Sequence, residues 1–136
     1  MSEKVKVIAC SGIGKVFGLM AREAALEAAE REPELTENVC LAHLVTGKET
    51  AEKKVKGCSC ITIDGCPALC SAKSVEEAGG IVKAKFRSVD IMRKHRGKDA
   101  GTGSVLTEDG WRITGELAEM VTDEVRKMAK EEKENV

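Results

Sequence analysis

Aromatic residues are nearly absent from this chain of 136 residues. Only Phe17, Phe86 and Trp111 occur, and there is no tyrosine. Domains that stack RNA or single-stranded DNA bases need several exposed aromatic side chains, so the composition argues against them. Charge argues the same way, because 22 Lys and Arg are balanced by 23 Asp and Glu, with both signs interleaved. We therefore expect no nucleic-acid partner.

Long hydrophobic runs are missing as well. No apolar run approaches the ~20 residues of a membrane-spanning helix, so we expect no membrane partner. The first residues, MSEKVKVIAC, lack the apolar segment of a signal peptide, which predicts a cytoplasmic protein. A chain of this length buries about two thirds of its surface on folding. We expect one domain over residues 1–136.

Cysteine, by contrast, is frequent. The six residues are Cys10, Cys40, Cys58, Cys60, Cys66 and Cys70. Disulfide frameworks are typical of small secreted chains with poor cores, and we expect neither secretion nor a shortage of core residues here. Thiols that stay reduced in a cytosol indicate metal binding or redox chemistry instead.

Strand-like and helix-like segments alternate along the chain, which is typical of a parallel α/β sheet. The patterns predict strands at 4–9, 37–44, 58–63 and 80–88, and helices at 15–31, 47–56, from 67 to the Gly79–Gly80 pair, and from 113 onward. We expect a three-layer α/β fold with a mostly parallel sheet of four or slightly more strands. Helices would cover both faces, in a flavodoxin- or Rossmann-like order. Residues 130–136 are expected to form a frayed tail.

Charged residues dominate the second half of the chain. Val82, Ala84 and Phe86 alternate with basic residues, which predicts a half-exposed edge strand with these three side chains facing inward. Residues 92–104 are charged and glycine-rich, so we expect a flexible loop in which His95 is solvated. One hypothesis makes the protein an interaction module whose partner docks on this loop or on the C-terminal helix.

Four cysteines fall where predicted strands end. Cys10 follows the first strand, Cys66 follows the third, and Cys70 lies one helical turn beyond Cys66. In a doubly wound sheet the first and third strands are neighbours, and their carboxyl ends form the ligand-binding crevice. If the second strand ends near Cys40, a fourth thiol reaches the same edge. This arrangement outlines a tetrahedral metal site.

The other two cysteines begin the third strand. Cys60 would therefore lie well over ~10 Å from the carboxyl end of that strand, at about 3.3 Å per residue. We expect Cys58 and Cys60 to be small buried residues packed under a helix.

The segment IDGCPALC is the most specific local motif. Gly65 permits a sharp turn from strand to helix, and Cys66 would then lie at the helix N-terminus, where N–H groups and the helix dipole stabilise a thiolate. Such a thiolate serves as a metal ligand or as a nucleophile. We expect Asp64 to accept hydrogen bonds from the turn that it opens. Lys73 is either solvated or a counter-charge to the thiolates.

These motifs resemble the DGC-domain family, which is named after the Asp-Gly-Cys triplet found here at 64–66. The sequences IACSG, CLA and IDGCPALC carry the resemblance, over about Val5 to Gly79. The family is described by four cysteines proposed as zinc ligands, and it implies metal binding without a defined reaction. By motif these ligands fall on Cys10, Cys40, Cys66 and Cys70.

Two classes of function follow from the same thiols. The leading hypothesis is one zinc ion in a closed four-thiolate site, with a structural, sensing or metal-handling role. The alternative is a cysteine-based redox protein, because four thiolates also hold an iron–sulfur cluster and Cys66 has the setting for thiol or persulfide chemistry. His43 would supply a nitrogen ligand only if one thiol were missing. The glycine-rich segment 12–18 matches no nucleotide-binding motif, and we interpret it as a tight turn.

Overall fold

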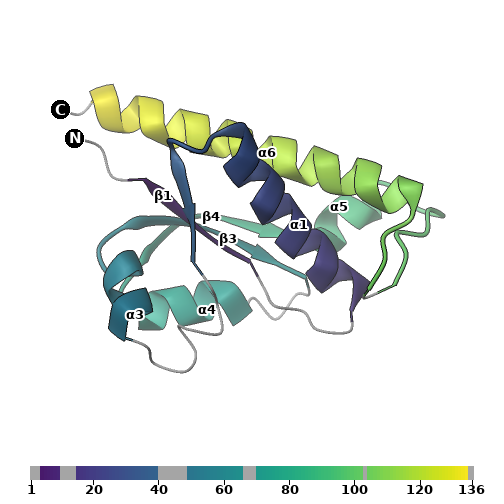
Figure 1. The fold of residues 1–136 in the computed structure, drawn as a ribbon, viewed down its shortest axis with the longest axis horizontal. Helices are drawn as coiled ribbons and strands as arrows, with labels where there is room; N and C mark the ends of the chain where they lie inside the picture. Colours follow the sequence, from purple (N-terminus) through teal and green to yellow (C-terminus); the bar gives the residue numbers. More distant parts are fainter. Residues whose placement is uncertain (1–3, 10–14, 40–48, 66–69, 103, 135–136) are drawn as a thin grey trace.

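The computed structural model describes residues 4–9, 15–39, 49–65, 70–102 and 104–134. In these ranges, strands and helices alternate over most of the chain and two helices complete it (Figure 1). The elements are β1 (Val5–Ala9), α1 (Val16–Arg31), β2 (Thr36–Asn38), α3 (Glu49–Val55), β3 (Ser59–Asp64), α4 (Cys70–Glu77), β4 (Ile81–Arg87), α5 (Ser88–Arg93) and α6 (Glu108–Glu134).

The four strands form one parallel sheet in the order β2-β1-β3-β4. This order confirms the predicted α/β fold and its flavodoxin-like arrangement. The chain moves outward from β1 to β2 and then returns past β1 to β3, so right-handed crossovers place α1 on one face and α3 on the other. Figure 1 shows α1 and α6 above the sheet and α3 and α4 below it.

A separate apolar cluster lies on each face of the sheet. On one face, Val7, Ile61 and Ile63 pack with the alanine-rich side of α1 and the apolar stripe of α6. Small alanine side chains let α1 approach both the sheet and α6 closely, and Ala21, Ala24, Ala25 and Ala28 are all buried. On the other face, a smaller cluster consists of Ile8, Val39, Val55, Cys60 and Val75.

Strand β4 lies at the edge of the sheet, as its alternating sequence predicts. Its register slips by one residue, because Cys60 pairs with Val82 while Ile61 pairs with Ala84. Lys83 is the extra residue of this bulge. Val82 therefore packs with the cluster on the α3 and α4 face, whereas Ala84 packs on the opposite face. The expectation that both point to one side was wrong, since it assumed a regular strand.

The segment between β4 and α6 contains a short helix and several hydrogen bonds that the sequence did not indicate. Helix α5 includes Met92 and was not predicted. Further on, the Thr107 hydroxyl donates to the Asp99 carbonyl at 2.6 Å and accepts from the Gly110 N–H at 3.0 Å, which caps α6. His95, expected to be solvated, has a side chain only 24% exposed and contacts Glu116 at 2.6 Å.

Helix α6 is 27 residues long and reaches Glu134, so the helix extends into the tail that was expected to fray from residue 130. Charged residues alternate with its apolar stripe throughout. In the described part of the chain, no helix combines the length and hydropathy needed to cross a membrane. The ion pair of Arg126 with Glu32 at 2.6 Å ties the middle of α6 to the end of α1.

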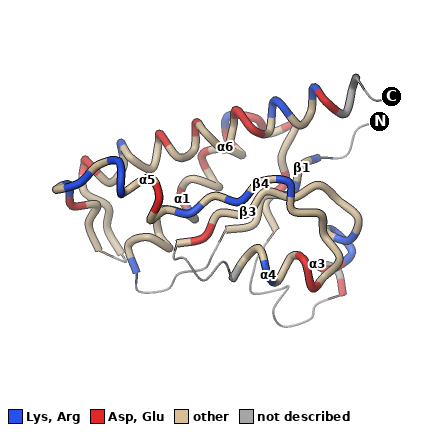
Figure 2. The backbone as a smooth tube through the Cα atoms, turned by 180° about the vertical axis from the view of Figure 1, so that it is seen from behind, with Lys and Arg blue, Asp and Glu red and all other residues tan. Residues whose placement is uncertain are grey.

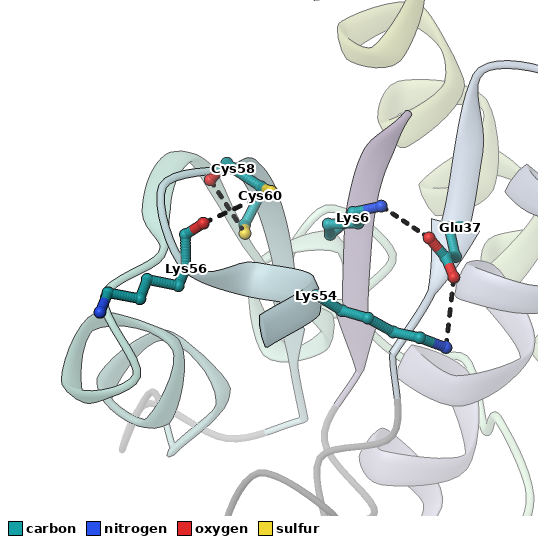
Figure 3. A network of polar contacts seen from close by, with 6 residues as sticks. All are labelled: Lys6, Glu37, Lys54, Lys56, Cys58 and Cys60. Carbon is teal, nitrogen blue, oxygen red and sulfur yellow. Dashed lines mark hydrogen bonds and ion pairs between the residues drawn. The ribbon is translucent and has the colours of Figure 1, made fainter. Parts of the chain in front are cut away.

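An ion-pair network joins β1, β2 and α3. Glu37 accepts a hydrogen bond from the Lys6 ammonium at 2.6 Å and contacts the Lys54 ammonium at 3.3 Å (Figure 3). The Lys6 side chain is only 11% exposed, so solvent screens this pair less than an open surface pair. The hydrogen bond from Lys6 lowers the pKa of the Glu37 carboxyl.

Glu37→Gln is expected to reduce the free energy of unfolding by about 0.5–1 kcal/mol at neutral pH. Because the folded state lowers the pKa of Glu37, this stabilisation is present above the ordinary pKa of 4.5 and is lost as pH falls through the folded value. Urea unfolding of both proteins should therefore show a difference at pH 7 that narrows at acidic pH. A constant difference at all pH values would contradict this assignment.

Candidate metal centre

Three of the candidate cysteines each follow a described residue at the carboxyl edge of the sheet. Cys10 follows Ala9, which pairs in register with Ile63 of β3. Cys40 follows Val39, whose N–H donates to the Val7 carbonyl of β1 at 3.0 Å. Cys66 follows Gly65 at the end of β3. Since adjacent strands lie about 4.8 Å apart, Ala9, Val39 and Gly65 lie at neighbouring strand ends.

The end of β3 is in direct backbone contact with the first turn of α1. A Cβ atom at Gly65 would lie 2.7 Å from the Gly18 nitrogen and 2.9 Å from the carbonyl carbon of Phe17. Only a residue without a side chain fits there, and the facing residue is itself a glycine. This contact holds Asp64 and Gly65, the first two residues of the triplet, next to the first turn of α1.

The opposite face of β3 holds the start of α4. The Ser71 N–H donates to Oδ1 of Asp64 at 2.8 Å, and both residues are fully buried. A carboxylate at this position satisfies one of the N–H groups that a helix leaves open in its first turn. The expectation that Asp64 accepts a backbone hydrogen bond is confirmed, although the donor lies seven residues further along the chain.

Further polar atoms around this carboxylate are buried without partners among the described residues. They are Oδ2 of Asp64, Oγ1 of Thr62 and the Ser71 hydroxyl. Thr62 and Asp64 alternate along β3 and so share its α4 face. Buried polar atoms in native proteins are nearly always hydrogen-bonded. The end of β3 therefore carries a buried cluster of polar side chains, which consists of Asp64 of the triplet together with Thr62 and Ser71.

The structure describes only part of the predicted ligand set. Cys70 is the first residue of α4, where the positive end of the helix dipole favours a thiolate. Cys10, Cys40, Cys66 and the predicted helix start at Pro67 lie outside the described residues, as does His43. Among the residues that the structure describes, no group of three or more metal-ligating side chains occurs. Lys73 is exposed on α4.

Cys58 and Cys60 lie at the amino-terminal end of β3, where both thiols are buried (Figure 3). The Cys60 thiol donates to the Cys58 carbonyl at 3.3 Å and packs in the smaller apolar cluster. Burial raises the pKa of Cys60 to about 11, so this thiol stays protonated at neutral pH. The packing role predicted for Cys60 is confirmed, and it is a poor nucleophile and metal ligand.

Sequence analysis missed two residues that support this edge. Gly18 was considered only as the end of the glycine-rich segment 12–18, whereas it lies in α1 and contacts Gly65. Ser88, the first residue of α5, is fully buried and its hydroxyl donates to the Phe17 carbonyl at 2.8 Å. No local pattern identifies Ser88, because its partner lies 71 residues away.

A family model of the DGC domain matches residues 6–107. The chain belongs to the DGC-domain family. The match includes β2, β3, β4, all of β1 except Val5, and every cysteine of the predicted set. Comparisons with curated proteins and with solved structures gave no match. The family assignment therefore rests on the sequence, whereas the geometry of Asp64 and Gly65 comes from the structure.

Gly65→Ala is expected to destabilise the DGC domain by about 2 kcal/mol, because the new methyl group would meet backbone atoms that cannot move independently. Gly115→Ala is the matched control. A Cβ at Gly115 meets nothing within 4 Å in the middle of α6, so that variant should gain about 0.5–1 kcal/mol. Thermal unfolding of the two variants should shift in opposite directions. Equal shifts would contradict the close contact of Gly65 with Gly18.

Asp64→Ala should cost about 1–3 kcal/mol, because it leaves the buried Ser71 N–H without an acceptor. Asp64→Asn retains an acceptor and should cost less. Asp123→Ala, which removes an exposed aspartate of α6, should stay within about 0.5 kcal/mol of the parent. Chemical denaturation of the three variants tests this order, and an equal loss in Asp64→Asn and Asp64→Ala would show that the hydrogen bond is not what Asp64 contributes.

Proposed function

We propose that this DGC-domain protein binds one zinc ion through Cys10, Cys40, Cys66 and Cys70, and that its role is structural, metal-handling or sensing. The observation that carries the proposal is the placement of Ala9, Val39 and Gly65 on three adjacent strands at one edge of the sheet. Each of these residues directly precedes one of the cysteines. Cys70 begins the helix that Asp64 fastens to the same edge.

The donor set suits zinc. Cysteine thiolates are preferred ligands of Zn²⁺, and four of them close its coordination shell. A closed shell leaves no position for a substrate, which favours holding or passing on the metal over hydrolysis. Helix α4 contributes its positive N-terminal dipole near the negative charge that four thiolates would bring. We propose a cytoplasmic location, because this ligand set requires thiols that stay reduced.

Cys58 and Cys60 are excluded from the proposed site by position. Four residues separate Cys60 from Asp64 along β3, a span of about 13 Å at ~3.3 Å per residue. Zinc–sulfur bonds are about 2.3 Å long, so one ion cannot join both ends of this strand. These two cysteines therefore provide a matched control for the ligands.

Metal analysis of anaerobically purified protein should give about one zinc per chain without labile sulfide. Cys66→Ser should lose this zinc, whereas Cys58→Ser should retain it. Removal of the zinc by a chelator should lower the unfolding temperature of the parent, because a metal that binds only the folded state stabilises it.

Three results would overturn the zinc proposal. Iron with labile sulfide would indicate an iron–sulfur electron carrier at the same thiols. A metal-free protein with a reactive, low-pKa thiol lost in Cys66→Ser would indicate thiol or persulfide chemistry. Retention of zinc in Cys66→Ser together with its loss in Cys58→Ser would move the site to the other end of β3.

A further inference from the structure

Positive charge is concentrated in one short stretch of the chain. Residues 83–98 contain seven Lys and Arg and one Asp, a net charge of 7 − 1 = +6, whereas the whole chain carries −1. Figure 2 shows blue segments along β4 and again beyond α5, on one side of the molecule. We call this surface the basic edge. Its cations are Lys83, Lys85, Arg87, Arg93, Lys94, Arg96 and Lys98.

About half of these cations are already neutralised within the protein. Lys85 pairs with Glu76 of α4 at 3.4 Å, and Asp90 holds both Arg87 and Arg93. The remaining four are Lys83, Lys94, Arg96 and Lys98. These four are exposed and form no ion pair with any residue that the structure describes. They are therefore available to an anionic partner.

A small pocket opens within the basic edge, between β4, α5 and α6. Its volume is about 230 Å³. Phe86, Ile91 and Leu117 supply apolar lining, and Met120, which is 40% exposed, forms part of its wall. Lys85, Arg87, Asp90 and Lys94 also line it, and of these cations only Lys94 forms no ion pair with a described residue. Pockets that enclose whole drug-sized ligands measure about 300–1,000 Å³, so this one has the size for a single large apolar side chain.

We propose that the basic edge docks an acidic segment of a partner protein, with one apolar side chain of that segment seated in the pocket. The positive rim complements carboxylates, and the apolar lining complements the anchoring side chain. A second copy of this chain does not fit, because β4 edges would bring their lysines together. A nucleic-acid backbone has no apolar side chain for the pocket.

The basic edge adjoins the end of the sheet where the candidate metal centre lies. Arg87, at the end of β4, pairs in register with Asp64 at the end of β3. Helix α5 is also attached to the first turn of α1 through Ser88. An acidic segment bound here would therefore bring its protein next to the Asp-Gly-Cys triplet. The docking proposal stands on residues outside the predicted ligand set and does not require the zinc.

The test uses the full chain and a fluorescent, end-capped peptide of alternating Glu and Asp with one central Phe. Fluorescence anisotropy should show saturable binding at low salt that weakens towards about 0.15 M ionic strength, where the Debye length is about 8 Å. Replacing the Phe of the peptide by Ala should weaken binding about tenfold, because the pocket is then left empty.

Lys83→Glu, Lys94→Glu and Arg96→Glu, combined in one variant, should weaken binding by at least about tenfold and flatten its salt dependence. The matched control combines Arg22→Glu, Lys127→Glu and Lys130→Glu, which changes the net charge equally at exposed positions outside the basic edge. This control should bind within about twofold of the parent. Met120→Gln, which leaves the net charge unchanged, should reduce binding through the pocket alone. Zinc content should stay unchanged in all of these variants.

Three outcomes would overturn the docking proposal. One is the absence of saturable binding at low salt. Another is an equal loss in the control variant, which would show attraction to net charge only. The third is tighter binding of an oligothymidylate of equal net charge, lost in the same triple variant, which would make the basic edge a nucleic-acid surface. Loss of zinc in Cys66→Ser with peptide binding intact would separate this proposal from the proposed function.

Discussion

The contact of Gly65 with Gly18 determines how the centre of the sheet meets its first helix. Strand β3 lies between β1 and β4, and Gly65, the residue that follows it, passes so close to Gly18 of α1 that no side chain fits at Gly65. The ends of β1 and β3 therefore converge beside α1, with Ala9 in register with Ile63. The metal-binding hypothesis depends on that convergence. Gly65 of the triplet therefore has a structural role, whereas Cys66 is the proposed metal ligand.

Successive residues of β3 face opposite sides of the sheet and have different roles. Ile61 and Ile63 face α1 and α6 and belong to the larger apolar cluster, whereas Thr62 and Asp64 face α4 and carry polar groups into the interior. Burying a carboxylate is costly unless it is hydrogen-bonded, and Asp64 is bonded to the start of α4. The strand thus fixes a helix N-terminus at the carboxyl edge while its apolar face supplies stability.

Elements with strong periodicity were predictable from sequence, and irregular ones were not. The order of strands followed from alternation and from the handedness of crossovers. The end of α4 followed from the Gly79–Gly80 pair, of which Gly79 adopts a positive φ of 89°. The bulge at Lys83 depends on how β4 packs against β3, which no local pattern encodes. Ser88 acts across 71 residues, and α5 is too short for its pattern to be recognised. The four candidate cysteines were selected by topology and motif, and three of them lie outside the described residues.

The irregularity of β4 has a consequence for the surface. A regular strand would place Val82, Ala84 and Phe86 on one face, but the extra residue turns Val82 towards α4 and leaves Phe86 beside α5 and α6. The bulge therefore places Phe86 in the apolar lining of the pocket. The exposed Lys83 adds positive charge to the same edge. Lysines and a bulge on an edge strand normally prevent it from pairing with the edge strand of another molecule. Here the same features produce a surface whose charge and shape select an acidic partner, beside the strand ends where the metal is proposed to bind.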